Sequence, residues 1–189
     1  MTVLHTWANQ HLDWASIHAT MPVNMLEDGE ERVQSGNSLR LALFGNPETL
    51  QIPHHKLEKD GSARGILCGG NLSVLYSLLG SDLQLDSAGK LLFLEDLDEY
   101  LYHVDRMMQA INRSGIGTKA AAWLIGGMSE MRDNAIPYGY NAEEIIAQAH
   151  QTLDSPLCFG IEAGHIPLNR ALVFGMHYQL EAGRLSPLL

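Results

Sequence analysis

The stretch Lys90-Leu91-Leu92-Phe93-Leu94-Glu95 decides the fold. Four consecutive apolar residues closed by a carboxylate are typical of a buried strand whose end carries a functional side chain. A helix is expected directly after it, over about 97–113, because apolar residues there recur at spacings of three and four. That apolar stripe consists of Leu97, Leu101, Val104, Met108 and Ile111. A buried strand that runs into an amphipathic helix indicates an α/β domain.

The same unit recurs on both sides of this stretch. Upstream, Gly65-Ile66-Leu67-Cys68 predicts a buried strand that turns at Gly69-Gly70. Asn71 is then expected to cap a helix over 72–79. The elements expected downstream are a strand over 120–125 that ends in Gly126-Gly127, a helix over 142–150 capped by Asn141, and short strands over 157–161, 171–174 and 178–181. This alternation of strands and helices predicts the α/β fold class.

The first sixty residues follow a less regular pattern. The expected elements are a helix over 2–12 and strands over 14–18, 39–44 and 49–52. Polar segments at 27–38 and 54–61 are interpreted as linkers or exposed turns. Because an apolar helix at residue 2 is an abrupt opening for a domain, we expect Met1 to be an internal methionine of a longer protein.

Composition excludes several classes of partner. A chain of 189 residues that is 46% hydrophobic can bury one sizeable core. Its net charge of -10, with only 12 basic residues, argues against nucleic acid, because phosphate binding needs clustered Lys and Arg. No apolar run reaches the roughly 18 residues of a membrane span, and the N-terminus does not resemble a signal peptide. A soluble, unexported chain with reduced, buried Cys68 and Cys158 is expected.

Glu95 and His165 are the candidate catalytic residues. Glu95 ends an apolar strand, and the ends of strands are where α/β folds place functional side chains. Its alternative role is to complement, with neighbouring acidic residues, the positive N-terminus of the following helix. His165 follows Gly164, which lets the backbone turn sharply and leaves the imidazole accessible. Its alternative role is that of a turn histidine bonded to the backbone.

The other histidines and a metal site are weaker candidates. His11, His54, His55 and His150 lie in polar or helix-end contexts and are interpreted as solvated. His103 is expected to pair with Glu99 or Asp96 on the long helix. No His-x-x-x-His on a helix and no Cys/His quartet occurs, so the sequence predicts no metal site.

A binding turn and a nucleophile complete the set of candidates. The backbone N–H groups of Gly69, Gly70 and Asn71 could bind a peptide carboxylate, although paired glycines are also ordinary turn residues. An imidazole held by a carboxylate activates a serine, but Gly-x-Ser-x-Gly is absent from the chain. The segment most similar to that motif is Gly127-Met128-Ser129, which lacks the second glycine of a tight nucleophile elbow.

Several motifs in order carry a resemblance to a known family. These are Gly65-Ile66-Leu67-Cys68-Gly69-Gly70-Asn71-Leu72, Leu92-Phe93-Leu94-Glu95-Asp96 with Glu99-Tyr100, Asp105-Arg106-Met107-Met108, Gly126-Gly127, and Phe159-Gly160 leading to Gly164-His165. The chain resembles the C-terminal part of the LD-carboxypeptidase family of serine peptidases, which includes microcin C immunity peptidases. The resemblance is strongest from Arg64 to Phe174.

The resemblance implies a fold, a domain division and site roles. The fold is a swivelling β/β/α C-terminal domain at 61–189, linker strands at 31–60, and at 1–30 a remnant of the N-terminal α/β domain. Glu95 would be the triad glutamate and His165 the triad histidine. The triad serine would lie upstream of residue 1, in a Gly-x-Ser-Asp segment. The family's His-Gly-Pro sequence appears here as His18-Ala19-Thr20-Met21-Pro22.

The resemblance also implies an activity. A cytoplasmic, homodimeric full-length protein would remove the terminal D-alanine from murein tetrapeptides during peptidoglycan recycling, with no cofactor and no metal. The 189-residue chain alone would be inactive. The alternatives are a microcin C-type immunity peptidase acting on a peptide-nucleotide, a muropeptide-binding module without catalysis, and a purely structural fragment.

Overall fold

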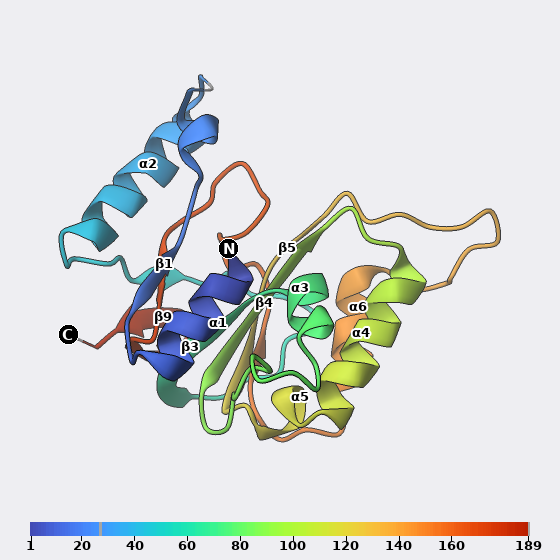
Figure 1. Ribbon diagram of the computed structural model, residues 1–189. Helices are drawn as coiled ribbons and strands as arrows, with labels where there is room; N and C mark the ends of the chain where they lie inside the picture. Colours follow the sequence, from blue (N-terminus) through green and yellow to red (C-terminus); the bar gives the residue numbers. More distant parts are fainter. Residues whose placement is uncertain (27, 189) are drawn as a thin grey trace.

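The computed structural model describes residues 1–26 and 28–188 and is built on a mixed seven-stranded sheet (Figure 1). The strand order is β2 (Leu50–Gln51), β9 (Arg184–Pro187), β8 (His177–Glu181), β3 (Ala63–Asn71), β4 (Leu91–Leu97), β5 (Ala122–Ser129) and β6 (Leu157–Cys158). The four strands from β3 to β6 are parallel, and the others are antiparallel. Parallel strands are covered on both faces, which is why β4 begins with an unbroken apolar run.

Helices cover one face of the parallel strands. They are α3 (Leu72–Ser77), α4 (Leu101–Arg113), α5 (Ile116–Lys119) and α6 (Ala142–His150), and in Figure 1 α4 and α6 run side by side. Their apolar stripes pack on the strand side chains that point to this face, such as Leu92, Leu94 and Trp123. Asn141 caps α6 in a capping box with Glu144, so the predicted cap is confirmed. The predicted α/β class is confirmed as well.

The opposite face is covered by chain segments instead of long helices. Successive side chains of a strand point to opposite faces, so the neighbours of the residues above, such as Leu67, Phe93 and Leu124, lie on this face. They pack against Phe174 and Tyr178. Phe174 belongs to β7 (Leu172–Phe174), which forms a separate two-stranded sheet with β1 (Ser16–His18). This pairing brings the start of the chain across the surface to the segment that carries His165.

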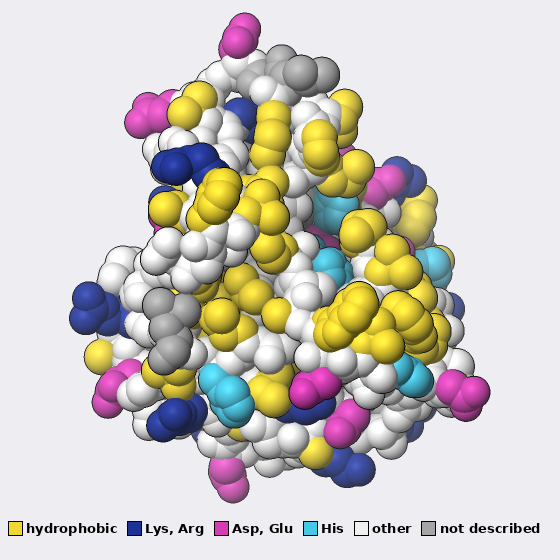
Figure 2. Space-filling model, turned by 60° about the vertical axis from the view of Figure 1, so that its left-hand side comes forward, with side chains coloured by type: hydrophobic (Ala, Val, Ile, Leu, Met, Phe, Trp, Pro, Cys, Tyr) yellow, Lys and Arg dark blue, Asp and Glu magenta, His cyan; other side chains and the backbone are white. Residues whose placement is uncertain are grey.

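Helix α1 (Thr2–His11) buries its polar side and exposes its apolar side. Thr2, His5 and Thr6 are buried, whereas hydrophobic residues of α1 and the following turn face outward. These outward residues are Val3, Leu4, Trp7 and Trp14, which we name the α1 patch. Hydrophobic side chains gather on the face drawn in Figure 2.

Helix α2 (Glu30–Leu43) replaces the linker predicted at 27–38 and the strand predicted at 39–44, and both of those predictions are wrong. Glu27 lies outside the described residues. The helix is held by its small polar residues, because Ser35 Oγ accepts a hydrogen bond from the Asn169 N–H at 2.9 Å. Ser38 Oγ likewise accepts from the Ala171 N–H at 3.0 Å. The predicted linker strands at 31–60 therefore begin with a helix, which follows the short 3-10 helix η1 (Pro22–Leu26).

The remaining differences concern element ends. The strand β4 continues to Leu97, so α4 begins at Leu101 and not at about residue 97. Asp98 has a positive φ of 63°, which breaks the chain direction between the two elements. The sequence did not predict α5 or β9. Within residues 1–26 and 28–188, no helix is both long and apolar enough to cross a bilayer.

Candidate active site

Glu95 lies at an irregularity in the parallel sheet. Leu94 pairs with Ile125 and Asp96 with Met128, so one extra residue of β5 stands opposite Glu95. Such a bulge re-aims the side chain beside it and is common next to functional sites. The Glu95 side chain is fully buried, yet it reaches a pocket at the carboxyl ends of the parallel strands. The prediction that Glu95 ends the strand is wrong, because β4 continues to Leu97, and Glu95 instead lies at the irregularity within the strand.

His165 comes from the long segment between β6 and β7. The segment is tied to the sheet by the Gly127 N–H, which donates to the Ala163 carbonyl at 3.0 Å. A side-chain carbon on Gly126 would stand 2.5 Å from that same carbonyl oxygen, so this approach requires glycine. Gly126-Gly127 therefore allows the backbone before His165 to lie directly against β5.

Glu95 and His165, 70 residues apart in the chain, meet in a hydrogen bond. His165 Nδ1 lies 2.7 Å from Glu95 Oε2, and the His165 backbone N–H donates to the same oxygen at 3.3 Å. Because a carboxylate only accepts, Nδ1 carries the proton and Nε2 is left as an acceptor. The imidazole is half exposed while the carboxylate is enclosed. The predicted contact is confirmed, and the arrangement suits an imidazole that removes a proton through Nε2.

The two side chains share a pocket of about 840 Å³ with residues of the first twenty positions. Among the lining residues are His5 on α1, His18 at the end of β1, and Thr20 in the following loop. Burial, aided by the nearby His5 and His165, lowers the pKa of His18 to about 4. Burial likewise lowers the pKa of His5 to about 4. Both rings are neutral at pH 7, so the pocket wall opposite Glu95 offers neutral hydrogen-bonding groups.

Sequence reasoning missed His5 and gave no role to His18. The available signal was weak, because a single histidine on a short helix is usually solvated. What reveals them is the polar buried side of α1, on which His5 Nδ1 lies 2.9 Å from Ser16 Oγ. The pairing of β1 with β7 then stacks His18 on Phe174, with 5.4 Å between ring centroids.

Of the predicted binding turn, only Asn71 lines the pocket. Gly69 and Gly70 are buried within β3, where a side-chain carbon would lie 1.9 Å from the Phe93 carbonyl oxygen and 2.7 Å from Thr2 Oγ1, respectively. The Asn71 backbone N–H already donates to Thr2 Oγ1 at 3.1 Å. Close packing thus accounts for both glycines, and a substrate-binding role for Gly69, Gly70 and Asn71 stays a prediction.

Two acidic residues that follow Glu95, Asp96 and Glu99, make contacts that stabilise neighbouring elements. Asp96 accepts hydrogen bonds from Asn71 Nδ2 at 2.7 Å and from the Ser73 N–H at 2.8 Å, which holds the start of α3. Glu99 lies 3.2 Å from His103, so that predicted pair is confirmed. A carboxylate at the positive N-terminus of a helix was the alternative role considered for Glu95. Asp96 has that role, and the helix is α3 instead of the helix that follows.

Ser129 is hydrogen-bonded to the backbone of His165 and not to its ring. Its Oγ donates to the His165 carbonyl oxygen at 2.6 Å. The hydroxyl proton therefore points to the backbone, which suits a brace for the loop and not a nucleophile that passes its proton to the imidazole. The hydroxyl of Ser129 thereby connects the end of β5 to the residue that carries the candidate base.

Two predictions about other side chains are settled by burial. His150 is 1% exposed, packs edge-on against Trp123 and lies 3.1 Å from Ser155 Oγ, so its interpretation as solvated is wrong. Cys68 and Cys158 are free thiols, and Cys68 is buried as predicted, whereas Cys158 is only half-buried. Burial raises their pKa values to about 12 and about 11, respectively. In the described part of the chain, no group of three or more metal-ligating side chains is arranged around one point.

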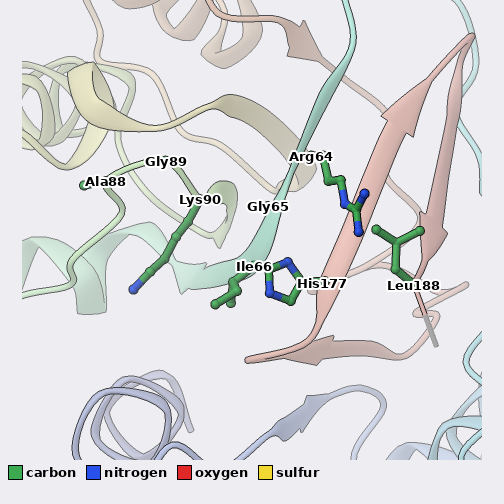
Figure 3. Close-up of a pocket in the computed structure, with 8 residues that line it drawn as sticks. All are labelled: Arg64, Gly65, Ile66, Ala88, Gly89, Lys90, His177 and Leu188. Carbon is green, nitrogen blue, oxygen red and sulfur yellow. The ribbon is translucent and has the colours of Figure 1, made fainter.

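A second pocket, of about 660 Å³, lies at the other end of β3 (Figure 3). Its polar lining is Arg64, Lys90 and His177. In Figure 3 the Lys90 side chain extends away from Arg64, and Lys90 Nζ lies 3.8 Å from Asp86. The cationic groups do not converge, so this pocket lacks the arrangement of a binding site.

Solved structures define the class of fold. The crystal structure of muramoyltetrapeptide carboxypeptidase from Oxalobacter formigenes is similar to this chain with a TM-score of 0.84 and 25% identity, over 98% of this chain and 64% of that one. The microcin C7 self immunity protein MccF also gives a TM-score of 0.84, at 15% identity, over 100% of this chain and 65% of that one. The second likeness concerns the fold alone.

The particular family follows from the sequence comparison. Residues 64–180 match the LD-carboxypeptidase C-terminal domain, and the chain belongs to that family. It is 34% identical over 119 residues to a probable murein peptide carboxypeptidase of Bacillus subtilis, covering 61% of this chain and 36% of the relative. It is 27% identical over 168 residues to the murein tetrapeptide carboxypeptidase of Pseudomonas aeruginosa, covering 87% of this chain and 53% of the relative. The chain thus spans only part of the length of these relatives.

Proposed function

We propose that this chain supplies the base and its orienting carboxylate to a serine LD-carboxypeptidase that removes the terminal D-alanine from murein tetrapeptides. The observation that carries the proposal is the hydrogen bond between buried Glu95 and half-exposed His165 at the edge of a pocket. Family membership supports the reaction class, because relatives of this chain are named murein peptide carboxypeptidases.

In the proposed mechanism each atom of the couple has a role. His165 Nε2 takes the proton of a serine hydroxyl as its oxygen attacks the peptide carbonyl, and returns it to the leaving D-alanine amine. Glu95 Oε2 holds the Nδ1 proton, which fixes the tautomer and stabilises the imidazolium. Water then releases the acyl group from the serine, with His165 again acting as base.

The serine of this mechanism would lie outside these 189 residues. Within residues 1–26 and 28–188, no serine hydroxyl is hydrogen-bonded to the His165 ring, and Ser129 is bonded to the backbone. We therefore propose that the chain alone does not turn over substrate. The assembled enzyme would act in the cytoplasm, in peptidoglycan recycling, as a homodimer.

The test is D-alanine release from L-alanyl-γ-D-glutamyl-meso-diaminopimelyl-D-alanine. The chain is assayed alone and fused to the preceding segment of the Pseudomonas relative. The fusion should be active, and His165→Ala and Glu95→Gln should each reduce turnover by about 10²–10⁴-fold. His103→Ala and Glu99→Gln, which disrupt a second His–Glu pair between α4 and the residues just before it, are the matched controls and should retain turnover.

Two results would contradict the proposal. Release of D-alanine by the 189-residue chain alone would place the nucleophile within it. Hydrolysis of aspartyl sulfamoyl adenosine, with no D-alanine release from the tetrapeptide, would assign the fusion to the activity of an immunity peptidase instead.

A further inference from the structure

Unpartnered polar atoms concentrate in the pocket that holds Glu95 and His165. Among the described residues, four buried side-chain N or O atoms have no hydrogen-bond partner: His18 Nε2, Thr20 Oγ1, Glu95 Oε1 and Asn112 Oδ1. The first three belong to residues that line this pocket. Leaving such an atom without a partner destabilises a folded protein by about 1–3 kcal/mol. Three in one pocket indicate a surface shaped to bond something other than the protein itself.

The His18 ring cannot turn to find a partner within the chain. It is stacked on Phe174 at an interplanar angle of 24° and lies 5.4 Å from the Phe93 ring, centroid to centroid. Its backbone is fixed by the pairing of His18 with Leu172 between β1 and β7. Thr20, two residues further along, is 5% exposed. Both polar atoms are thus held in place on the pocket wall contributed by residues 17–20.

The charges around this wall favour a neutral ligand group. The groups facing His18 are His5, His165 and the N-terminal amine, and with burial they lower the pKa of His18 to about 4, so its ring is uncharged at pH 7. Glu95 and Glu130 also line the pocket together with Arg32, so the charged lining has both signs and offers no excess of cations for an anion. The unpartnered Nε2 of neutral His18 donates or accepts one hydrogen bond according to the tautomer, and the Thr20 hydroxyl can donate one and accept others. A peptide group offers both an N–H and a carbonyl.

We propose that His18 and Thr20 form a subsite that hydrogen-bonds a peptide group of the substrate, beside the Glu95–His165 couple. The proposal rests on the proposed function, since it names the part of a murein peptide that this wall would hold. His18 and Thr20 are binding residues here and take no part in proton transfer. They fix the direction in which the peptide enters, which places the scissile bond over His165 Nε2.

The first experiment measures stability without ligand. His18→Phe keeps the ring stacking and Thr20→Val keeps the shape, but both remove the unpartnered atom. Each variant of the 189-residue chain should unfold at the same temperature as the wild type or up to about 2–4 °C higher, because a desolvation cost disappears. The matched controls remove buried polar atoms that are bonded: Thr6→Val loses the bond to the Thr2 carbonyl, and His150→Phe loses the contact with Ser155. Both controls should unfold at a lower temperature.

The second experiment measures binding of the murein tetrapeptide by calorimetry. His18→Phe and Thr20→Val should each weaken binding about fivefold to tenfold, the effect of one net hydrogen bond. Thr6→Val and His150→Phe should bind like the wild type. Variants that are as stable as the wild type but bind more weakly would show that these atoms serve the ligand.

The other outcomes overturn the subsite and distinguish it from the proposed function. A fall in unfolding temperature for both His18→Phe and Thr20→Val would assign the two atoms to the fold, through bound water, and not to a ligand. Wild-type affinity in both variants would remove the subsite while leaving the proposed function intact. No tetrapeptide binding by the wild-type chain would overturn the subsite, whereas the proposed function would fall only if the fusion also failed to release D-alanine from the tetrapeptide.

Discussion

Gly164 lies so close to Glu95 that a larger residue at position 164 would overlap the Glu95 side chain. A side-chain carbon on Gly164 would stand 2.8 Å from Cβ of Glu95 and 2.9 Å from its Oε2. The backbone of Gly164 has φ +107°, a conformation that favours glycine, and its N–H donates to Asn169 Oδ1 at 3.0 Å. The glycine before the candidate base is therefore what allows the carboxylate and His165 to share one hydrogen bond.

Gly164→Ala should destabilise the chain and separate the couple. Gly139→Ala is the matched control, since Gly139 also has a positive φ, +95°, but no atom within 4 Å of the added carbon. Gly164→Ala should reduce the free energy of unfolding by about 1–3 kcal/mol more than Gly139→Ala, because it adds overpacking to backbone strain. Denaturant unfolding measures both. Equal costs would mean that the contact with Glu95 is looser than the structure places it.

Ser129→Ala tests whether Ser129 braces the loop or attacks the substrate. In the active fusion, loss of its bond to the His165 carbonyl should reduce kcat by less than about tenfold and the free energy of unfolding by about 1 kcal/mol. Steady-state kinetics on the tetrapeptide provides the measurement, with Ser114→Ala, a helix-end serine bonded to the Ile111 carbonyl, as the control. Abolished turnover in Ser129→Ala would identify it as the nucleophile.

Acid should destabilise the chain partly through His150. Burial, aided by the positive charge of Lys59, lowers the pKa of His150 from 6.5 to about 4. Between these values the unfolded state binds a proton that the folded state excludes, so stability is full above about pH 6.5 and falls as the pH drops toward 4. One such group contributes a slope of at most about 1.4 kcal/mol per pH unit.

His150→Phe should reduce the slope of stability against pH by up to about 1.4 kcal/mol per pH unit, which is the contribution of one proton. The measurement is denaturant unfolding of wild type and variant at several pH values between 4 and 7.5. His5 and His18, whose pKa values are also lowered to about 4, retain the remaining dependence in the variant. Parallel stability curves for the two proteins would show that His150 titrates alike in the folded and unfolded states.

The α1 patch should cause the isolated chain to associate. Leu4 is 57% and Trp7 44% exposed, and contiguous apolar surface of this kind drives contacts between molecules. Leu4→Lys combined with Trp7→Lys should shift the chain toward monomer in sedimentation velocity while leaving its unfolding temperature nearly unchanged. Ile136→Lys replaces an 85% exposed residue of the loop between β5 and α6, outside the α1 patch, and should leave association unaltered. Equal association in both variants would mean that another surface is responsible.

The apolar strands were predictable because their signal is local. Strand β4 is recognisable in Leu91-Leu92-Phe93-Leu94, and the stripe of α4 buries Val104, Met108 and Ile111 as the spacing predicts. The caps at Asn71 and Asn141 follow from short-range hydrogen bonds, from Val74 and Glu144 respectively. The helical spacing could not predict where α4 starts, since β4 continues to Leu97 through its pairing with β5.

Helix α2 shows why other elements were mispredicted. Residues 39–44 alternate in a strand-like way, and nothing local marks Ser35 and Ser38 as contacts. The helix forms because those hydroxyls accept hydrogen bonds from Asn169 and Ala171, more than 130 positions away. A pattern in one segment cannot contain a partner that lies in another, so tertiary contact overrode the local preference.

By itself, the amino-acid sequence determined the class of the fold, the strand that carries Glu95 and the two candidate catalytic residues, because apolar periodicity and ordered motifs depend on near neighbours. Only the tertiary structure decided the distance of 2.7 Å between Glu95 and His165, the backbone role of Ser129, and the wall of His18 and Thr20 in the same pocket. These features depend on a bulge in β5, on glycines that let distant backbones touch, and on β1 crossing to β7. Each is a relation between segments far apart in the chain, and such relations exist only once the sheet has brought those segments together.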